Sequence, residues 1–198
     1  MKINRKEIKA LSREQIKGNI GMFLLVSIVL GLLWSALGPL ILGGPITLGF
    51  AYFILDIVRG RKGEFETAFA GFRQFGSSWV AFIVSGLVIG LGMMLLVIPG
   101  IIASLAYSMA FFILADNPGM GGIEALKQSR QLMKGHKWQY FVLNFSFIGW
   151  HLLAMLTLGL AYIYVLPYQS AAQANFYAKL KSESLDIDGE EPSVAAIE

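Results

Sequence analysis

The residues of this chain that could do chemistry are few, and the two histidines come first. His136 lies in a basic stretch, and His151 lies in an apolar stretch with no acidic residue near it in the sequence. A zinc site needs several ligands, and a hydrolytic triad needs a nucleophile, a base and a group that orients the base. The chain has no cysteine, no phosphate-binding loop and no paired carboxylates. We therefore expect no catalytic residue, no metal, no cofactor and no enzymatic activity.

Polar side chains interrupt the last apolar stretch of the sequence. Gln169 and Gln173 are four residues apart and share one face of a helix. In a membrane such groups turn inward, either to form hydrogen bonds with another helix or to line a wet path. Hydrogen bonding between helices is the leading interpretation, and a path for a solute is the alternative. The polar residues predicted to face the interior are Gln169, Ser170, Gln173, Asn175, Asn144 and His151.

Basic residues recur in a repeated string. Residues 12–18 read SREQIKG, residues 129–135 read SRQLMKG, and residues 72–76 (FRQFG) resemble a diverged third copy. Cations near a helix C-terminus complement the helix dipole and glycine ends the helix, so each copy predicts the end of an amphipathic helix. Arginine presents a planar fork that suits two phosphate oxygens, and anionic lipid attracts cations at the membrane surface. The predicted lipid- or phosphate-binding residues are Arg13, Lys17, Arg73, Arg130 and Lys134.

Two carboxylates stand at the ends of apolar stretches. Asp56 is close to Arg59 in the sequence, and Asp116 precedes Asn117. Transporters use carboxylates within the membrane to carry protons or ions. Asp56 and Asp116 lie at the edges instead, which favours a helix cap or an ion pair.

The composition indicates what must position these residues. Of the 198 residues, 56% are hydrophobic and 15% are charged, whereas soluble domains contain roughly 45–50% and about 25%. A soluble fold of this size could not bury so much apolar surface. The sequence therefore predicts an integral membrane protein.

The charges divide the chain into membrane and surface segments. Three stretches of 37 to 41 residues contain no Asp, Glu, Lys or Arg, and each is long enough for two spans of ~20 residues. A hairpin of two spans returns to its starting side, so all basic blocks share one face, which the positive-inside rule places in the cytoplasm with both termini. The uncharged stretches are 19–55, 79–115 and 138–178, and the sixteen basic residues lie within 2–17, 59–73, 127–137 and 179–181.

The predicted fold is all-α: a polytopic membrane protein with six transmembrane helices in three hairpin repeats, each preceded by a basic amphipathic helix at the interface. Gly38-Pro39, Gly90 to Gly92 and Thr157 to Gly159 mark the turns, and Pro45, Pro99 and Pro167 are expected to kink the second helices. The middle amphipathic helix has one apolar stripe, formed by Phe65, Ala68, Phe69, Phe72 and Phe75. Residues 1–181 form one membrane domain with repeats 5–58, 63–116 and 122–181, spans 19–37, 40–58, 77–91, 93–115, 138–156 and 160–178, and a disordered acidic tail, 182–198.

Two long strings carry a resemblance to a known family. Residues 113–153 (ILADNPGMGGIEALKQSRQLMKGHKWQYFVLNFSFIGWHLL) and 157–180 (TLGLAYIYVLPYQSAAQANFYAKL) resemble bacterial integral-membrane proteins of domain-of-unknown-function 975, as does the N-terminal RKEIKALSREQIKGN. The resemblance implies a polytopic membrane protein without an established activity. The family is similar in organisation to the membrane domain attached to some glycerophosphodiester phosphodiesterases, and it brings no catalytic residues.

The sequence thus favours a multi-pass protein of the cell membrane with cytoplasmic termini. Its expected partners are anionic lipid headgroups, with a partner protein or a second copy of the chain as further candidates, and no nucleic acid. The leading functional hypothesis is a non-enzymatic protein that engages anionic lipid or a partner protein through its basic cytoplasmic surface. The alternative is a transporter or channel for a small solute or lipid, lined by the sixth helix.

Overall fold

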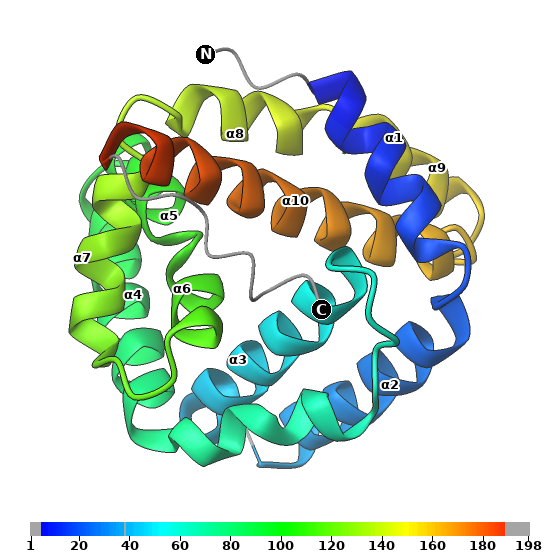
Figure 1. Cartoon of the computed structure of the whole chain (residues 1–198), viewed down its shortest axis with the longest axis horizontal. Helices are drawn as coiled ribbons and strands as arrows, with labels where there is room; N and C mark the ends of the chain where they lie inside the picture. The colour runs from blue at the N-terminus through cyan, green and yellow to red at the C-terminus, as the bar shows by residue number, and fades with distance from the viewer. Residues whose placement is uncertain (1–4, 38, 189–198) are drawn as a thin grey trace.

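The computed structural model describes residues 5–37 and 39–188, with side chains for 5–35 and 40–184, and its regular structure is helical throughout. The elements are α1 (Arg5–Ile16), α2 (Ile20–Leu37), α3 (Pro39–Val58), the 3-10 helix η1 (Glu66–Gln74), α4 (Phe75–Leu95), α5 (Val97–Tyr107), α6 (Ala110–Asp116), α7 (Gly122–Leu132), α8 (Lys137–Phe145), α9 (Ile148–Leu156) and α10 (Tyr162–Asp188). They surround a common centre in Figure 1, where α10 crosses the upper part, α4 to α7 fill the left side and α2 and α3 lie to the lower right.

Several of these helices could cross a membrane. Four helical segments of the described chain are long and apolar enough, and a fifth candidate is the pair α1 and α2, which is bent by 88° between its two helices. The α10 helix, which carries the predicted sixth span, is not among the four and contains several polar residues. The four segments are Leu40–Val58, Glu66–Leu95, Val97–Asp116 and Lys137–Leu156. They indicate a multi-pass membrane protein.

The distribution of exposed apolar side chains agrees with a lipid environment. Met94, Leu95 and Leu158 are 87%, 79% and 96% exposed, and each lies near a junction between two helices. Only 11% of the most apolar window of the segment Glu66–Leu95 is buried within the protein. In water, so large an apolar surface would drive aggregation. Hydrocarbon around the bundle removes that cost.

The second apolar stretch turns at a different place from the one predicted. The α4 helix continues through Gly90 and Gly92, and Leu96 is the extended residue that separates α4 from α5. A Cβ atom at Gly92 would lie 3.0 Å from the backbone of Gly100, so this glycine permits close packing of α4 on α5. The boundary therefore lies at Leu96 and not at residues 91–93. Pro99 consequently falls in the first turn of α5, where proline is tolerated without a kink.

The third apolar stretch is divided more finely than predicted. Span 138–156 consists of α8 and α9, separated at Ser146 and Phe147, and a sharp turn follows. Leu158 and Gly159 have φ values of 51° and 90° in that turn, a conformation that glycine adopts at low cost. The α10 helix then continues to Asp188, so residues 182–188, which the sequence assigns to the tail, are helical.

The middle amphipathic segment packs against protein rather than lying only at a lipid surface. It is a 3-10 helix, and Ala68 on its apolar stripe is fully buried. Phe65, Phe69 and Phe72 are half-buried against the core, whereas Phe75 is 41% exposed. A Cβ atom at Gly49 of α3 would overlap the carbonyl oxygen of Ala68, so glycine allows the close contact of η1 with α3.

Each amphipathic segment packs on a helix that belongs to another apolar stretch. The α1 helix packs on α10, η1 packs on α3, and α7 packs on α4, α5 and α6. Further contacts close the bundle, among them α4 against α3 and α10 against α2 and α3. Large side chains that are almost completely buried fill the centre, namely Phe23, Phe53, Met109, Phe147, Phe176 and Tyr177.

Candidate functional site

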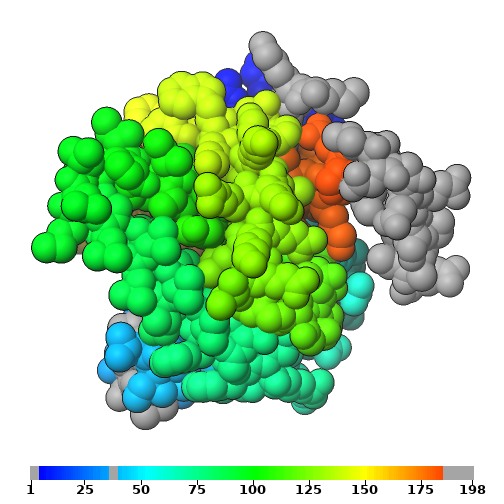
Figure 2. Space-filling view, turned by 90° about the vertical axis from the view of Figure 1, so that its left-hand side faces the viewer, coloured from blue at the N-terminus to red at the C-terminus, as the bar shows by residue number. Residues whose placement is uncertain are grey.

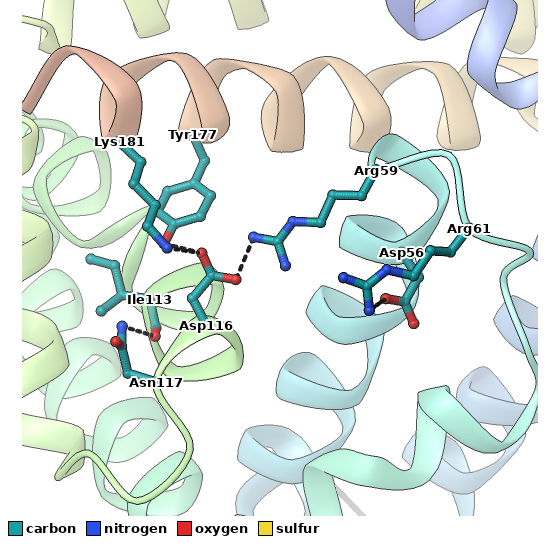
Figure 3. A network of polar contacts seen from close by, with 8 residues as sticks. All are labelled: Asp56, Arg59, Arg61, Ile113, Asp116, Asn117, Tyr177 and Lys181. Carbon is teal, nitrogen blue, oxygen red and sulfur yellow. Dashed lines mark hydrogen bonds and ion pairs between the residues drawn. The ribbon is translucent and has the colours of Figure 1, made fainter. Parts of the chain in front are cut away.

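A buried carboxylate lies where α3 and α6 end beside the α10 helix. The α6 helix stops at Asp116, and the next residue, Asn117, donates from its side-chain amide to the carbonyl of Ile113 at 2.9 Å. Pro118 follows, and a proline cannot donate the next helical hydrogen bond. These two residues end the helix and leave the Asp116 side chain directed toward α3 and α10 (Figure 3).

Three side chains surround that carboxylate. Arg59, just beyond the end of α3, pairs with one oxygen at 2.5 Å, and Lys181 of α10 pairs with the other at 2.7 Å. The Tyr177 hydroxyl, one turn before Lys181, donates to the second oxygen at 2.9 Å. The Asp116 side chain is only 2% exposed, whereas Arg59 and Lys181 remain partly exposed. We call these four residues the Asp116 cluster.

Asp56, the other carboxylate at a span end, is bound more loosely. Its oxygen lies 3.7 Å from the Arg61 guanidinium, and both side chains are more exposed than Asp116 (Figure 3). Exposed ion pairs of this kind contribute only about 0–1 kcal/mol. A helix cap or an ion pair was the role predicted for both carboxylates, and both form ion pairs with arginine.

The amides of α10 form hydrogen bonds with other helices. Asn144 of α8 accepts from Gln173 at 2.9 Å and from Gln169 at 3.4 Å through one side-chain oxygen. Asn175 donates to Gln15 at 2.7 Å and to Ser12 at 3.0 Å, both on α1. The polar residues of α10 therefore connect it to α8 on one face and to α1 on another.

Two further residues of the predicted polar interior have apolar or mixed surroundings. Ser170 is half-buried on α10, between the two glutamines. His151 is half-buried, and its ring centroid lies 5.8 Å from that of Tyr162. Among the side chains that the structure describes, those of residues 5–35 and 40–184, no group of three His, Asp or Glu could hold a metal ion.

The predicted lipid-binding cations all lie on the surface. All five are exposed, and none forms an ion pair with a carboxylate within the described part of the chain. One arginine of the repeated string lies near a tyrosine. The Arg13 guanidinium is 5.8 Å from the ring centre of Tyr168.

The serine of the repeated string has a role that sequence reasoning missed. Ser12 is fully buried and accepts from Asn175 of α10, which fixes α1 on that helix. Ser129 is also fully buried, donates to the carbonyl of Ala106 at 2.8 Å and accepts from the backbone N–H of Met109 at 3.2 Å. In both copies the serine is buried and the arginine that follows it is exposed. The recurrence of Ser-Arg was the available signal.

The Asp116 cluster contains partners that the sequence did not single out. Tyr177 and Lys181 were seen only as part of the sixth span and the last basic block. Their spacing of four residues puts both on one helix face. That spacing, together with a basic residue after each of the first and third stretches, was the signal that could have located the cluster.

Comparison with known proteins adds a family and no activity. Residues 92–184 match the model of a family described as "Protein of unknown function (DUF975)". The resemblance found in the sequence is thereby confirmed over this range, and the N-terminal string lies outside it. No curated protein and no solved structure matches the chain.

Proposed function

We propose that this chain, in which residues 92–184 carry the match to a family of unknown function, is a non-enzymatic membrane protein that binds anionic lipid through a cytoplasmic basic collar. The basic collar consists of Arg13, Lys17, Arg73, Arg130 and Lys134. The proposal includes six spans in three hairpin repeats with both termini in the cytoplasm. A partner protein or a second copy of the chain could meet the same surface.

The packing of the amphipathic segments supports the three-repeat organisation. The segment of the first repeat packs on the second span of the third, and that of the second repeat packs on the second span of the first. The segment of the third repeat packs on both spans of the second. This pattern returns to its starting point after three steps. A cyclic arrangement of three similar hairpins accounts for it without further assumptions.

The ion pairs support a common side for the first, second and fourth basic blocks. Arg59 and Lys181, from the second and fourth blocks, reach the same carboxylate. Lys179 of the fourth block lies 3.4 Å from Glu7, which lies within the first block. Side chains this close cannot lie on opposite sides of a bilayer whose hydrocarbon core is ~30 Å thick. The positive-inside rule then favours the cytoplasm for that side.

The single observation that carries the lipid proposal is the exposure of the collar without acidic partners. Five cations lie on the surface and none pairs with a carboxylate of the described chain. Lysine and arginine beside an anionic leaflet each contribute about 1 kcal/mol. The collar would therefore enrich anionic lipid around the protein.

The hydrogen bonds of α10 favour this proposal over transport. Gln169 and Gln173, the expected lining of a solute path, donate to Asn144 on a neighbouring helix. Amides paired in this way stabilise helix contacts, whereas a path needs polar groups that face water. The transport alternative requires those amides to exchange partners with a solute.

The test compares charge variants in vesicles of phosphatidylglycerol and phosphatidylcholine. Replacing Arg13, Arg73 and Arg130 with Gln should reduce the co-purified phosphatidylglycerol severalfold. The control replaces three exposed basic residues outside the collar, Arg5, Lys62 and Lys127, with Gln and should retain more of that lipid. Gln169→Ala and Gln173→Ala should leave lipid retention unchanged. Equal retention by the arginine variant and wild type, with a solute flux that Gln173→Ala abolishes, would replace this proposal with transport.

A further inference from the structure

An apolar groove opens on the face formed by α4, α5, α7 and α8. Its volume is about 340 Å³, within the range of roughly 300–1,000 Å³ for small-molecule pockets. Figure 2 is turned toward this face, with the green atoms of α5 beside the yellow-green atoms of α7 and α8. The lining residues are Val88, Pro99, Ile102, Ala103, Ala106, Tyr107, Arg130 and Lys137.

The groove has a polar end and an apolar end. Along α5 its lining runs from Pro99 to Tyr107, which is about 12 Å at ~1.5 Å per residue. Small side chains at Ala103 and Ala106 leave the space open. Arg130 and Lys137, on two other helices, contribute two positive charges to the lining and no acidic residue is among it.

Burial of Ser129 places Arg130 at this groove. Ser129 bridges the carbonyl of Ala106, in the last turn of α5, and the N–H of Met109, in the break before α6. The hydroxyl therefore fixes the last turn of α7 against the end of α5. Arg130, the next residue, is exposed and lines the groove beside Tyr107.

We propose that this groove binds one anionic phospholipid, with the phosphate between Arg130 and Lys137 and one acyl chain along Pro99, Ile102 and Ala103. The inference rests on the proposed function and deepens it. It assigns one specific lipid site within a surface whose other cations attract anionic lipid without a defined binding site. The bound lipid joins α5, α7 and α8. Tyr107 offers a hydroxyl at the headgroup end.

The chemistry of the lining selects a lipid over a free anion. A phosphate ion needs only the two cations and gains nothing from an apolar groove. An acyl chain gains roughly 25 cal/mol per Å² of apolar surface removed from water, but in a bilayer that gain falls because the competing site is also apolar. The cations therefore supply selectivity for the headgroup, and the shape of the groove fixes the chain.

The experiment measures phosphatidylglycerol retained after extraction from vesicles of phosphatidylcholine and phosphatidylglycerol, by native mass spectrometry. In the Arg130→Gln/Lys137→Gln variant, the fraction of protein that retains one phosphatidylglycerol should fall at least tenfold. The charge-matched control Lys62→Gln/Lys127→Gln alters two exposed lysines outside the groove and should retain it. Ala103→Phe fills the groove, leaves every charge in place and should also lose the lipid. Thermal unfolding of each variant checks that the bundle is intact.

The outcomes separate this inference from the proposed function. Equal losses in the two double variants, with wild-type enrichment of phosphatidylglycerol, would overturn the specific site and leave the collar in place. Retention by Ala103→Phe would likewise exclude a chain in the groove, as would displacement of the lipid by inorganic phosphate alone. If a variant unfolds, photo-crosslinking of labelled phosphatidylglycerol to the wild-type protein tests the site instead. A crosslink at Ile102 supports the site, and crosslinks only at other residues overturn it. No enrichment in wild type would overturn both proposals.

Discussion

Arg59 and Asp116 are separated by 57 residues in the chain, yet their side chains form an ion pair at 2.5 Å between the ends of α3 and α6. Lys181 joins the same carboxylate from α10. One buried aspartate thus holds together the ends of α3 and α6 and the α10 helix, which belong to three apolar stretches. The arrangement gives this residue more weight in stability than any other carboxylate discussed above.

Asp116→Asn should destabilise the protein clearly. The substitution removes two ion pairs and weakens the hydrogen bond from Tyr177. Hydrogen bonds to charged groups contribute about 1.5–3 kcal/mol each, and the partial exposure of both cations places the expected loss at the lower end of that range. Thermal unfolding in detergent measures it.

Asp56→Asn is the matched control for that variant, because Asp56 also lies in the last turn of a helix and pairs with an arginine, but at 3.7 Å and with more exposure. Its expected loss is below about 1 kcal/mol. Equal losses in the two variants would contradict the special role of the Asp116 cluster.

The contact between Asn144 and Gln173 should show measurable coupling. The two amides hydrogen-bond at 2.9 Å between α8 and α10. In a double-mutant cycle with Asn144→Ala and Gln173→Ala, we expect a coupling free energy of about 0.6 kcal/mol and at most ~1.7 kcal/mol, the range for such bonds in membranes. Gln128→Ala, on the exposed face of α7, is the control and should not couple to Asn144. Independent effects of the two substitutions would show that the bond contributes nothing.

Gly49→Ala should separate η1 from α3. The added Cβ atom would overlap the carbonyl oxygen of Ala68, and a backbone atom cannot move aside as a flexible side chain can. Overpacking of this kind costs typically 1–3 kcal/mol. We expect a lower unfolding temperature and faster proteolysis within residues 60–76. Gly31→Ala, where a Cβ atom meets nothing within 4 Å, should have neither effect.

Reporter fusions test the proposed topology. Fusions after residue 62, after residue 120 and at the C-terminus should report the cytoplasm, and insertions at Leu96 and Leu158 should report the outside. The insertion in the second hairpin belongs at Leu96, because the helix continues through residue 91. Gly38, the predicted turn of the first hairpin, lies outside the described residues. A cytoplasmic signal at Leu158 would exclude a third hairpin with its tip outside.

Much of the architecture was predictable because it depends on local sequence. The uncharged stretches are about twice as long as one span and are separated by basic blocks. This pattern predicts helices in lipid, and the prediction does not depend on how the helices pack. The third turn, at Leu158 and Gly159, was predicted from residue type alone, since glycine adopts positive φ at low cost. The repeated Ser-Arg string likewise identified two helix ends in α1 and α7.

Prediction from local sequence failed for the turn of the second apolar stretch. Gly90 and Gly92 were predicted to turn the chain, yet both remain helical. Glycine serves equally for a turn and for close contact between two helices, and local sequence does not distinguish these uses. At Gly92 the neighbouring backbone of Gly100 decides in favour of close contact, whereas a Cβ atom at Gly90 would meet nothing within 4 Å.

The polar partners were decided by the tertiary structure alone. The sequence shows that Asp116, Asn144 and Gln173 stand in or beside apolar stretches, so each must find a partner or face water. Which partner each one meets depends on how the helices pack, because the choices lie 57, 65 and 29 residues away along the chain. The sequence thus determined which segments form long apolar helices and the need to satisfy their polar groups. Only the packing of α3, α6, α8 and α10 determined which groups satisfy one another, since hydrogen bonds and ion pairs require contact distances that spacing along the chain does not specify.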